Sequence, residues 1–255
     1  MDLPLFEDDL AAPGMFGPRD VLRNAHPAPG AAVLCFFPEV VAALARSGAR
    51  LVHRLRGERG HMEVWATEVD GRPLAVVHPG VGAPLAVMTL EELIALGARR
   101  IVAVGGAGAL GPDLVLGHAV VVTSAVRDEG TSFHYLPPGR VVDADPEGAA
   151  VLAAALDTAG VPYRAGRVWT TDAVYRETRQ RVDRRRAEGC LVVDMEASAF
   201  LAVARYRGVR FAQLLFAGDS LAGEVWEHRG WTTAREVREG LFAVAARAAL
   251  ALPEP

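Results

Sequence analysis

The sequence predicts an α/β fold: a three-layer αβα sandwich with a central mixed β-sheet. Of the 255 residues, 51% are hydrophobic, so the chain can bury a large core. Apolar runs rich in β-branched residues alternate with segments of helical periodicity. No internal repeat and no low-complexity linker interrupts this pattern. Because alternating strands and helices build layered α/β domains, we expect one domain over residues 31–255.

Residues 1–30 differ from the rest of the chain. They contain five prolines and show little periodicity. We expect an extended N-terminal arm that packs on the domain or on a neighbouring copy of the chain.

The first half of the domain combines strands, helices and one hairpin. The periodicities predict a strand at 33–37, a helix at about 38–47, hairpin strands at 61–69 and 73–77, and a helix at 84–96. The hairpin turn is predicted at Asp70-Gly71, and Gly97 gives the last helix a C-terminal stop.

The second half continues the alternation. The predicted strands are 100–104, 117–126, 163–169, 190–193 and 208–217, and the predicted helices are 146–159, 176–187, 195–207 and 232–251. Gly160 ends the first of these helices.

Composition excludes several classes of function. A net charge of −4 argues against nucleic-acid binding, because phosphate contacts need a basic surface. Cys35 and Cys190 lie in apolar surroundings and are expected to be buried thiols, and no metal-binding spacing is present. The acidic N-terminus is not a signal peptide, and no apolar run is long enough for a bilayer. We expect a cytoplasmic protein with no membrane partner.

Gly106, Gly108 and Gly111 have the spacing of a dinucleotide-binding fingerprint. That motif needs a helix that starts within the glycines, so that its N-terminus faces a pyrophosphate. Here Pro112 follows the last glycine, and residues 114–122 are typical of a further strand. The sequence therefore argues against a dehydrogenase. The glycines still let the backbone approach a packed neighbour or a ligand closely.

A second glycine pair, Gly80 and Gly82, precedes the helix predicted at 84–96. One interpretation is a plain structural turn. The other is a cradle of backbone amides for an anion or a hydroxyl at the start of a helix.

Two further segments place carboxylates at the ends of predicted strands. Asp194 and Glu196 flank Met195 where a strand runs into a helix, and Asp219 follows the strand at 208–217. Such carboxylates can simply bind the amides at a helix N-terminus. They can also accept hydrogen bonds from a sugar's hydroxyls, with the methionine packed on the sugar. The carboxyl end of a central strand is where open α/β folds bind ligands.

Together and in this order, these segments resemble the nucleoside phosphorylase family, which includes uridine phosphorylase, hexameric purine nucleoside phosphorylase and the methylthioadenosine nucleosidases. The resemblance covers about residues 31–250. It rests on residues 80–84 with 91–97, 104–110, 126–134, 194–197 and 218–220. It implies an enzyme that cleaves a nucleoside into a free base and pentose 1-phosphate.

The resemblance also implies roles for individual residues. Glu196 would hold the 2′- and 3′-hydroxyls, beside Asp194 and Met195, and Asp219 would protonate the leaving base, which favours a purine. The nucleophile loop would consist of Gly105, Gly106 and Ala107 with Gly80 and Gly82, and the base pocket of Tyr175, Arg176, Thr178 and Gln180. No metal or organic cofactor is implied; inorganic phosphate is the expected co-substrate. The family resemblance further implies a homo-oligomer, either a dimer or a trimer of dimers.

The chain departs from the family at the arginines that bind phosphate. The segment 36–41 lacks the usual arginine, Ala103 replaces another, and the arginine lent by a neighbouring subunit would fall near Met62. A hydroxyl residue is also replaced, by Gly106. Each charge-assisted hydrogen bond contributes roughly 1.5–3 kcal/mol, so losing three costs on the order of 5 kcal/mol unless other groups, such as Arg127 or Arg176, substitute.

Two alternatives to phosphorolysis therefore stay open. Nucleosidases of this family activate water with a glutamate after the first strand, and Glu39 lies near that place, although a glutamate at a helix start is more often a plain first-turn acid. The other alternative is a nucleoside-binding protein without turnover. The family resemblance places phosphorolysis first.

Overall fold

The structure is a computed structural model that describes residues 3–7, 9–22, 25–58 and 60–255. Its strands are β1 (Ala31–Cys35), β2 (Arg50–Gly57), β3 (Gly60–Val69), β4 (Arg72–Val77), β5 (Arg100–Ala109), β6 (Ala119–Asp128), β7 (Val141–Asp143), β8 (Tyr163–Thr171), β9 (Cys190–Asp194) and β10 (Arg210–Ser220). Its α-helices are α1 (Pro18–Val21), α2 (Pro38–Arg46), α3 (Ala83–Ala95), α4 (Pro146–Ala159), α5 (Arg179–Ala187), α6 (Ala197–Arg207) and α7 (Arg235–Ala251). Short 3₁₀ turns are η1 (Pro4–Phe6), η2 (Thr131–His134), η3 (Val174–Arg176) and η4 (Trp231–Thr233).

One mixed sheet contains all of these strands, and part of it closes on itself. Strand β10 pairs in parallel with β5 and antiparallel with β6, while β8 and β9 connect β6 back to β5. The ring β5–β10–β6–β8–β9 is therefore barrel-like. Strands β1, β4, β3 and β2 extend it as an open wing. The predicted mixed sheet is confirmed. The barrel-like closure of part of the sheet was not predicted.

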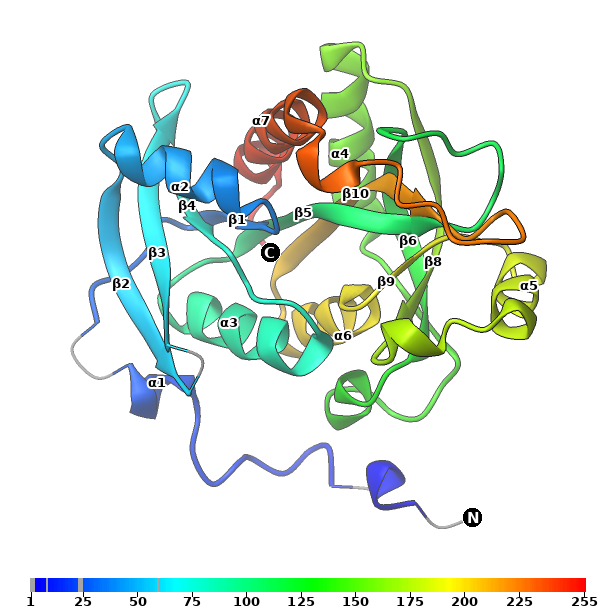
Figure 1. Ribbon diagram of the computed structural model, residues 1–255. Helices are drawn as coiled ribbons and strands as arrows, with labels where there is room; N and C mark the ends of the chain where they lie inside the picture. Colours follow the sequence, from blue (N-terminus) through cyan, green and yellow to red (C-terminus); the bar gives the residue numbers. More distant parts are fainter. Residues whose placement is uncertain (1–2, 8, 23–24, 59) are drawn as a thin grey trace.

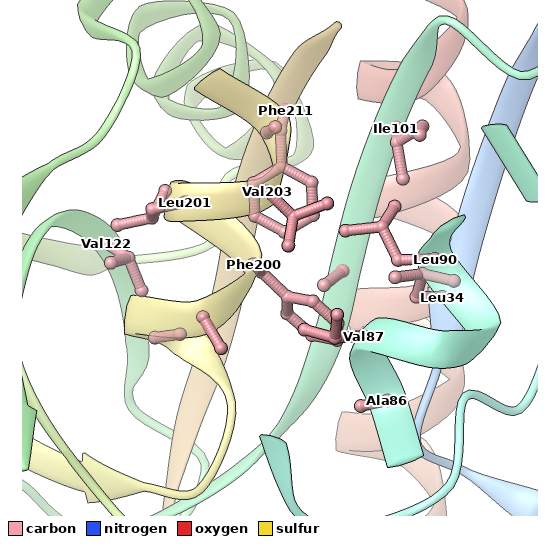
Figure 2. Packing of buried hydrophobic residues seen from close by; sticks show 14 of the residues in the cluster. Leu34, Ala86, Val87, Leu90, Ile101, Val122, Phe200, Leu201, Val203 and Phe211 are labelled. Atoms are coloured by element: carbon pink, nitrogen blue, oxygen red, sulfur yellow. The ribbon is translucent and has the colours of Figure 1, made fainter. Parts of the chain in front are cut away.

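Helices cover both faces of the sheet, which confirms the three layers (Figure 1). Alternate residues of β1 face opposite layers: Ala32 and Leu34 join the cluster with α3 and α6, whereas Val33 and Cys35 join the cluster with α2, α4 and α7. This is the two-residue period of a strand buried on both sides. Figure 2 shows the first cluster, where Phe200 of α6 packs on Phe211 of β10 with ring centroids 5.5 Å apart.

Most predicted elements are present, and the differences have local causes. Helix α4 has the predicted bounds and ends at Gly160, whose φ is +65°. Strand β2 was not predicted, because a bulge between Leu51 and His53 breaks its alternation and leaves only Val52 and Leu55 buried. Helix α6 begins at Ala197, later than expected, so Met195 and Glu196 lie in the connection before it.

The N-terminal arm lies along the edge of the molecule (Figure 1, dark blue). Leu22, Ala25 and Ala28 pack against the core, and the Ala28 amide donates to the Leu96 carbonyl at 2.8 Å. Farther out, the rings of Phe6 and Phe133 meet at 5.3 Å. Across the described ranges, no helix combines the length and apolarity needed to cross a bilayer.

Candidate functional site

A pair of buried carboxyls stands where β9 runs into α6. Asp194, the last residue of β9, accepts hydrogen bonds from the Thr170 hydroxyl (2.8 Å), the Ala197 amide (2.8 Å) and the Gln213 amide group (3.3 Å). These hydrogen bonds hold the Asp194 side chain in place at the connection between β9 and α6. Thr170 of β8 and Gln213 of β10 are buried polar residues, and sequence reasoning did not select them.

Glu196 is the second carboxyl of the pair. Its Oε1 accepts a hydrogen bond from the Gly82 amide at 2.6 Å, which ties the start of α6 to the start of α3. Burial raises the pKa of both Asp194 and Glu196, and the charge of Asp194 raises that of Glu196 further. The pair therefore holds a proton to higher pH than separate carboxyls would, and hydroxyl donors from a ligand would stabilise its ionised form.

The glycine turn before α3 orients this pair. Gly80 and Gly82 have φ values of +85° and +93°, which favour glycine over any residue with a side chain. The Gly80 amide donates to Nδ1 of His78 at 3.1 Å, and the Gly82 amide donates to Glu196. These two bonds favour the structural turn of the two interpretations given above, and an amide cradle for a ligand at this place stays a prediction. The turn positions the Glu196 carboxyl.

The predicted nucleophile loop at Gly105, Gly106 and Ala107 is not a loop. These residues continue β5 and pair in parallel with β10. On the other side of β5, the pairing with β1 ends at Val104 and the pairing with β9 begins at Gly108. The Phe36 ring lies 3.1 Å from the Cβ position of Gly105, and Phe216 lies 3.2 Å from that of Gly106. The glycines therefore admit aromatic neighbours, and the assignment of these residues to binding of the nucleophile stays a prediction.

Arg127 and Arg176 are the candidate substitutes for the missing phosphate-binding arginines. The first is engaged in hydrogen bonds and the second is exposed. Arg127 donates to the Ser132 hydroxyl (2.9 Å) and to the carbonyls of Leu136 and Pro137. Arg176 is exposed at the end of η3.

A cavity of about 920 Å³ opens beside the glycine turn. Its lining includes Pro38, His61, Met62, His78, Gly80 and Met88.

Glu39 is engaged in an ion pair. Its two carboxylate oxygens accept from Nε and Nη2 of Arg238 at 2.6 and 2.9 Å, and that guanidinium lies over the Phe37 ring at 4.6 Å. Arg238 is buried and belongs to α7. A carboxylate bound in this bidentate way is a poor base for water, so the geometry argues against the role predicted for Glu39.

Asp219 lies at a bulge near the end of β10, between Ala217 and Ser220. One oxygen accepts from the indole N–H of Trp226 at 2.6 Å, and the other lies 3.5 Å from the Cβ position of Gly108. Glu177, which sequence reasoning missed, is close enough for the charge of Asp219 to act on it: burial, followed by that charge, raises the pKa of Glu177 to about 7. Two carboxyls thus stand at this end of the site.

The four predicted base-binding residues lie on the segment from η3 to the start of α5, which also carries Glu177. Tyr175 is 97% exposed, and Arg176 and Gln180 are exposed as well. Thr178 is the N-cap of α5, where its hydroxyl accepts from the Arg181 amide at 3.4 Å. In the part of the chain that the structure describes, no hydrogen bond joins any of the four to Asp219 or Glu196.

Both cysteines are buried free thiols, as expected. Burial raises the pKa of Cys35 to about 12 and that of Cys190 to about 11. Within the described residues, no group of three or more histidine, cysteine, aspartate or glutamate side chains is arranged to hold a metal ion.

Known sequences match most of this chain. The family model described as "Phosphorylase superfamily" matches residues 31–252. A guanosine phosphorylase of Halorubrum lacusprofundi is 32% identical over 155 residues, 60% of this chain and 64% of that protein. A uridine phosphorylase of Escherichia coli is 28% identical over 160 residues, 57% of this chain and 63% of that protein. Each alignment thus spans less than two thirds of the relative's length.

Solved structures agree on the fold. A purine nucleoside phosphorylase from Toxoplasma gondii, in complex with immucillin-H, superposes with a TM-score of 0.76 at 24% identity, over 88% of this chain and 92% of that chain. A uridine phosphorylase from Vibrio fischeri, complexed with 6-hydroxy-1-naphthoic acid, gives 0.72 at 27% identity, over 88% and 90%. The predicted fold class is confirmed.

Proposed function

The chain belongs to the phosphorylase superfamily, and on that premise we propose that it cleaves the N-glycosidic bond of a nucleoside by phosphorolysis, giving a free base and pentose 1-phosphate. The observation that carries the proposal is the buried carboxyl of Glu196, held by the Gly82 amide at 2.6 Å beside Met195. A buried carboxyl fixed in this way is suited to bind the paired hydroxyls of a sugar.

Glu196 binds the 2′- and 3′-hydroxyls of the ribose in this proposal. Each hydroxyl donates a hydrogen bond to the carboxylate, which offsets the cost of ionising a buried acid. Met195, half-buried in the connection, packs on the sugar. As the glycosidic bond lengthens, positive charge develops on the sugar, and the nearby carboxylate stabilises it.

Asp219 acts on the leaving base. The indole of Trp226 holds one of its oxygens, so the other is directed away from that bond. A carboxyl there donates a proton to the base nitrogen and makes the base a better leaving group. This role suits a purine, whose N7 accepts the proton. One similar protein is named a guanosine phosphorylase and another a uridine phosphorylase, and the proposal takes the purine class first.

Phosphate is the proposed nucleophile, and it enters through the cavity beside Gly80. Hydrolysis is disfavoured because Arg238 binds both oxygens of Glu39. One observation favours the alternative of a nucleoside-binding protein without turnover. The rings of Phe36 and Phe216 lie against Gly105 and Gly106 of β5. We keep it as the second candidate.

Release of free base from a nucleoside panel tests the proposal. The panel is guanosine, inosine, adenosine, methylthioadenosine and uridine, each with and without phosphate. We expect release that requires phosphate and is fastest with a purine nucleoside. Equal release without phosphate would establish hydrolysis, and tight nucleoside binding with no release would establish the binding protein.

A further inference from the structure

His78 is the first residue after β4, and the proposed chemistry has not yet used it. Its half-buried side chain lines the cavity of about 920 Å³ beside the glycine turn. The Gly80 amide donates a hydrogen bond to Nδ1 of this histidine at 3.1 Å. Because Nδ1 accepts that bond, the proton of the neutral imidazole resides on Nε2. The neutral ring is therefore a hydrogen-bond donor through Nε2.

An aromatic contact orients the same imidazole. The Phe36 ring meets the His78 ring edge to face, with centroids 6.0 Å apart and an interplanar angle of 66°. Phe36 in turn lies 3.1 Å from the Cβ position of Gly105 in β5. The imidazole is thus held by a backbone amide on one side and by an aromatic ring on another. A donor that is already oriented loses little conformational freedom when it binds a ligand.

The glycine turn places His78 beside the carboxyl proposed to bind the ribose. The Gly80 amide holds His78, and the Gly82 amide, two residues later, holds Oε1 of Glu196 at 2.6 Å. The imidazole and the carboxyl are therefore both attached to one short turn.

The acid proposed to act on the base lies farther along β5. An oxygen of Asp219 is 3.5 Å from the Cβ position of Gly108, whereas Phe36, the neighbour of His78, contacts Gly105. Three residues of a strand span about 10 Å. His78 is therefore on the glycine-turn side of the site, apart from the base end. A nucleophile that displaces the base attacks C1′ from the side opposite the base, so it should bind on this side.

The other charged groups of the cavity lie on its outer wall. Of the described residues that line it, Glu58, His61 and Glu63 belong to the β2–β3 hairpin, and none is an arginine. Glu63 is paired with Arg54 at 3.0 Å, and Glu58 and His61 are exposed. His78 is the half-buried nitrogen donor next to the turn.

We propose that His78 binds the phosphate nucleophile in this cavity, with Nε2–H donating a hydrogen bond to a phosphate oxygen. This inference rests on the proposed function, and it assigns a donor to a chain that lacks the arginines expected from the family resemblance. In the reaction, a phosphate oxygen forms the bond to C1′, and the electron pair of the C1′–N bond goes to the base. His78 keeps its proton throughout and only holds the anion.

His78→Asn tests this role, because the Asn oxygen can still accept from the Gly80 amide while the Nε2–H donor is lost. His78→Gln is the companion variant, since its longer amide carries an N–H near the position of Nε2. The matched control is His61→Asn, an exposed histidine that lines the same cavity. Two quantities are measured: KM for phosphate at saturating purine nucleoside, and Kd for inorganic phosphate by calorimetry on the nucleoside-free protein.

In His78→Asn, KM and Kd for phosphate should rise about 10- to 100-fold, the effect of losing one hydrogen bond to a charged group. KM for the nucleoside should change less than about threefold, and His78→Gln should recover part of the loss. His61→Asn should leave both phosphate constants within about threefold. If His78→Asn does not fold, ¹⁵N spectra of the histidine rings replace it. A ring Nε2 signal that is absent from His78→Gln should then shift when phosphate is added.

Unchanged phosphate constants in His78→Asn, an equal rise in KM for both substrates, or the same effect in His61→Asn would overturn the role of His78. So would a His78 ring signal that phosphate does not shift. Phosphate-dependent cleavage together with one of these results contradicts the inference alone. If the unsubstituted protein releases no base, the proposed function fails, and the calorimetric Kd still tests whether His78 binds phosphate.

Discussion

Burial sets the protonation of the carboxyls that define this site. It is the first cause of the raised pKa of Asp194, Glu196 and Glu177, and the neighbouring acid is the main further cause for the latter two. Arg127 and Arg179 donate to backbone carbonyls, and Arg238 binds Glu39. In the proposed function, hydrogen bonds from a sugar's hydroxyls would favour the ionised form of Glu196, against the effect of its burial.

The raised pKa of Glu196 makes the stability of the ligand-free protein depend on pH. Above the ordinary glutamate value of 4.5, the folded state binds more protons than the unfolded state, so stability falls as pH rises toward neutral. Glu196→Gln should flatten the decrease in Tm measured by calorimetry between pH 5 and 8, by about 2–4 °C per kcal/mol for a chain of this size. The exposed Glu68→Gln is the control. Parallel curves of Tm against pH for Glu196→Gln and the unsubstituted protein would contradict this role of Glu196.

Asp219 is predicted to affect turnover rather than binding. Asp219→Asn keeps the acceptor for the Trp226 indole and removes the acid, so nucleoside Kd by calorimetry should change only a few-fold. The value of kcat should fall by about 10²–10⁴, the usual contribution of a general acid. Unchanged turnover would remove Asp219 from the mechanism.

At the scale of elements, the turn before α3 ties the start of α3 to the start of α6 through the bond from the Gly82 amide to Glu196. Gly82→Ala forces a side chain into a left-handed conformation, at a cost of about 1–2 kcal/mol, and displaces the amide that binds Glu196. We expect a KM for nucleoside raised about tenfold, equivalent to about 1.4 kcal/mol. Gly48→Ala is the matched control: its φ is +97° and nothing lies within 4 Å of its Cβ position. An equal rise of KM in Gly82→Ala and Gly48→Ala would show that backbone strain alone causes the effect.

The Glu39–Arg238 pair joins α2 to α7, and we predict a structural role for it. Glu39→Gln leaves the buried Arg238 without its charge partner, so the Tm should fall. Specific activity of the folded protein should stay within about twofold, because Glu39 is not the base in this account. Loss of activity with an unchanged Tm would instead support activation of water by Glu39.

Across the whole molecule, the sequence predicted the elements whose periodicity is strong. Helix α4 and the hairpin strands β3 and β4 agree closely with expectation. Strand β2 was missed because its bulge hides the alternation. The strand character of Gly105 and Gly106 depends on pairing with β10, a contact between distant parts of the chain that local patterns do not encode.

Part of the site could be predicted from the sequence. Asp194 ends β9, Glu196 precedes α6 in the connection after it, and Asp219 lies near the end of β10, so their positions follow from topology. The ion pair of Glu39 depends on Arg238, which lies 199 residues away in sequence. His78 becomes a candidate only through its bond to the Gly80 amide and the cavity beside it. The homo-oligomer stays a prediction, for which light scattering coupled to size exclusion is the direct measurement.

The most direct test of the central claim is ³¹P NMR of the protein incubated with guanosine and inorganic phosphate. The account predicts a new phosphomonoester resonance from pentose 1-phosphate, growing in step with free guanine, and neither product with Glu196→Ala. Guanine released with no organic phosphate would contradict phosphorolysis and indicate hydrolysis. Bound guanosine with no products would contradict an enzymatic role on this substrate.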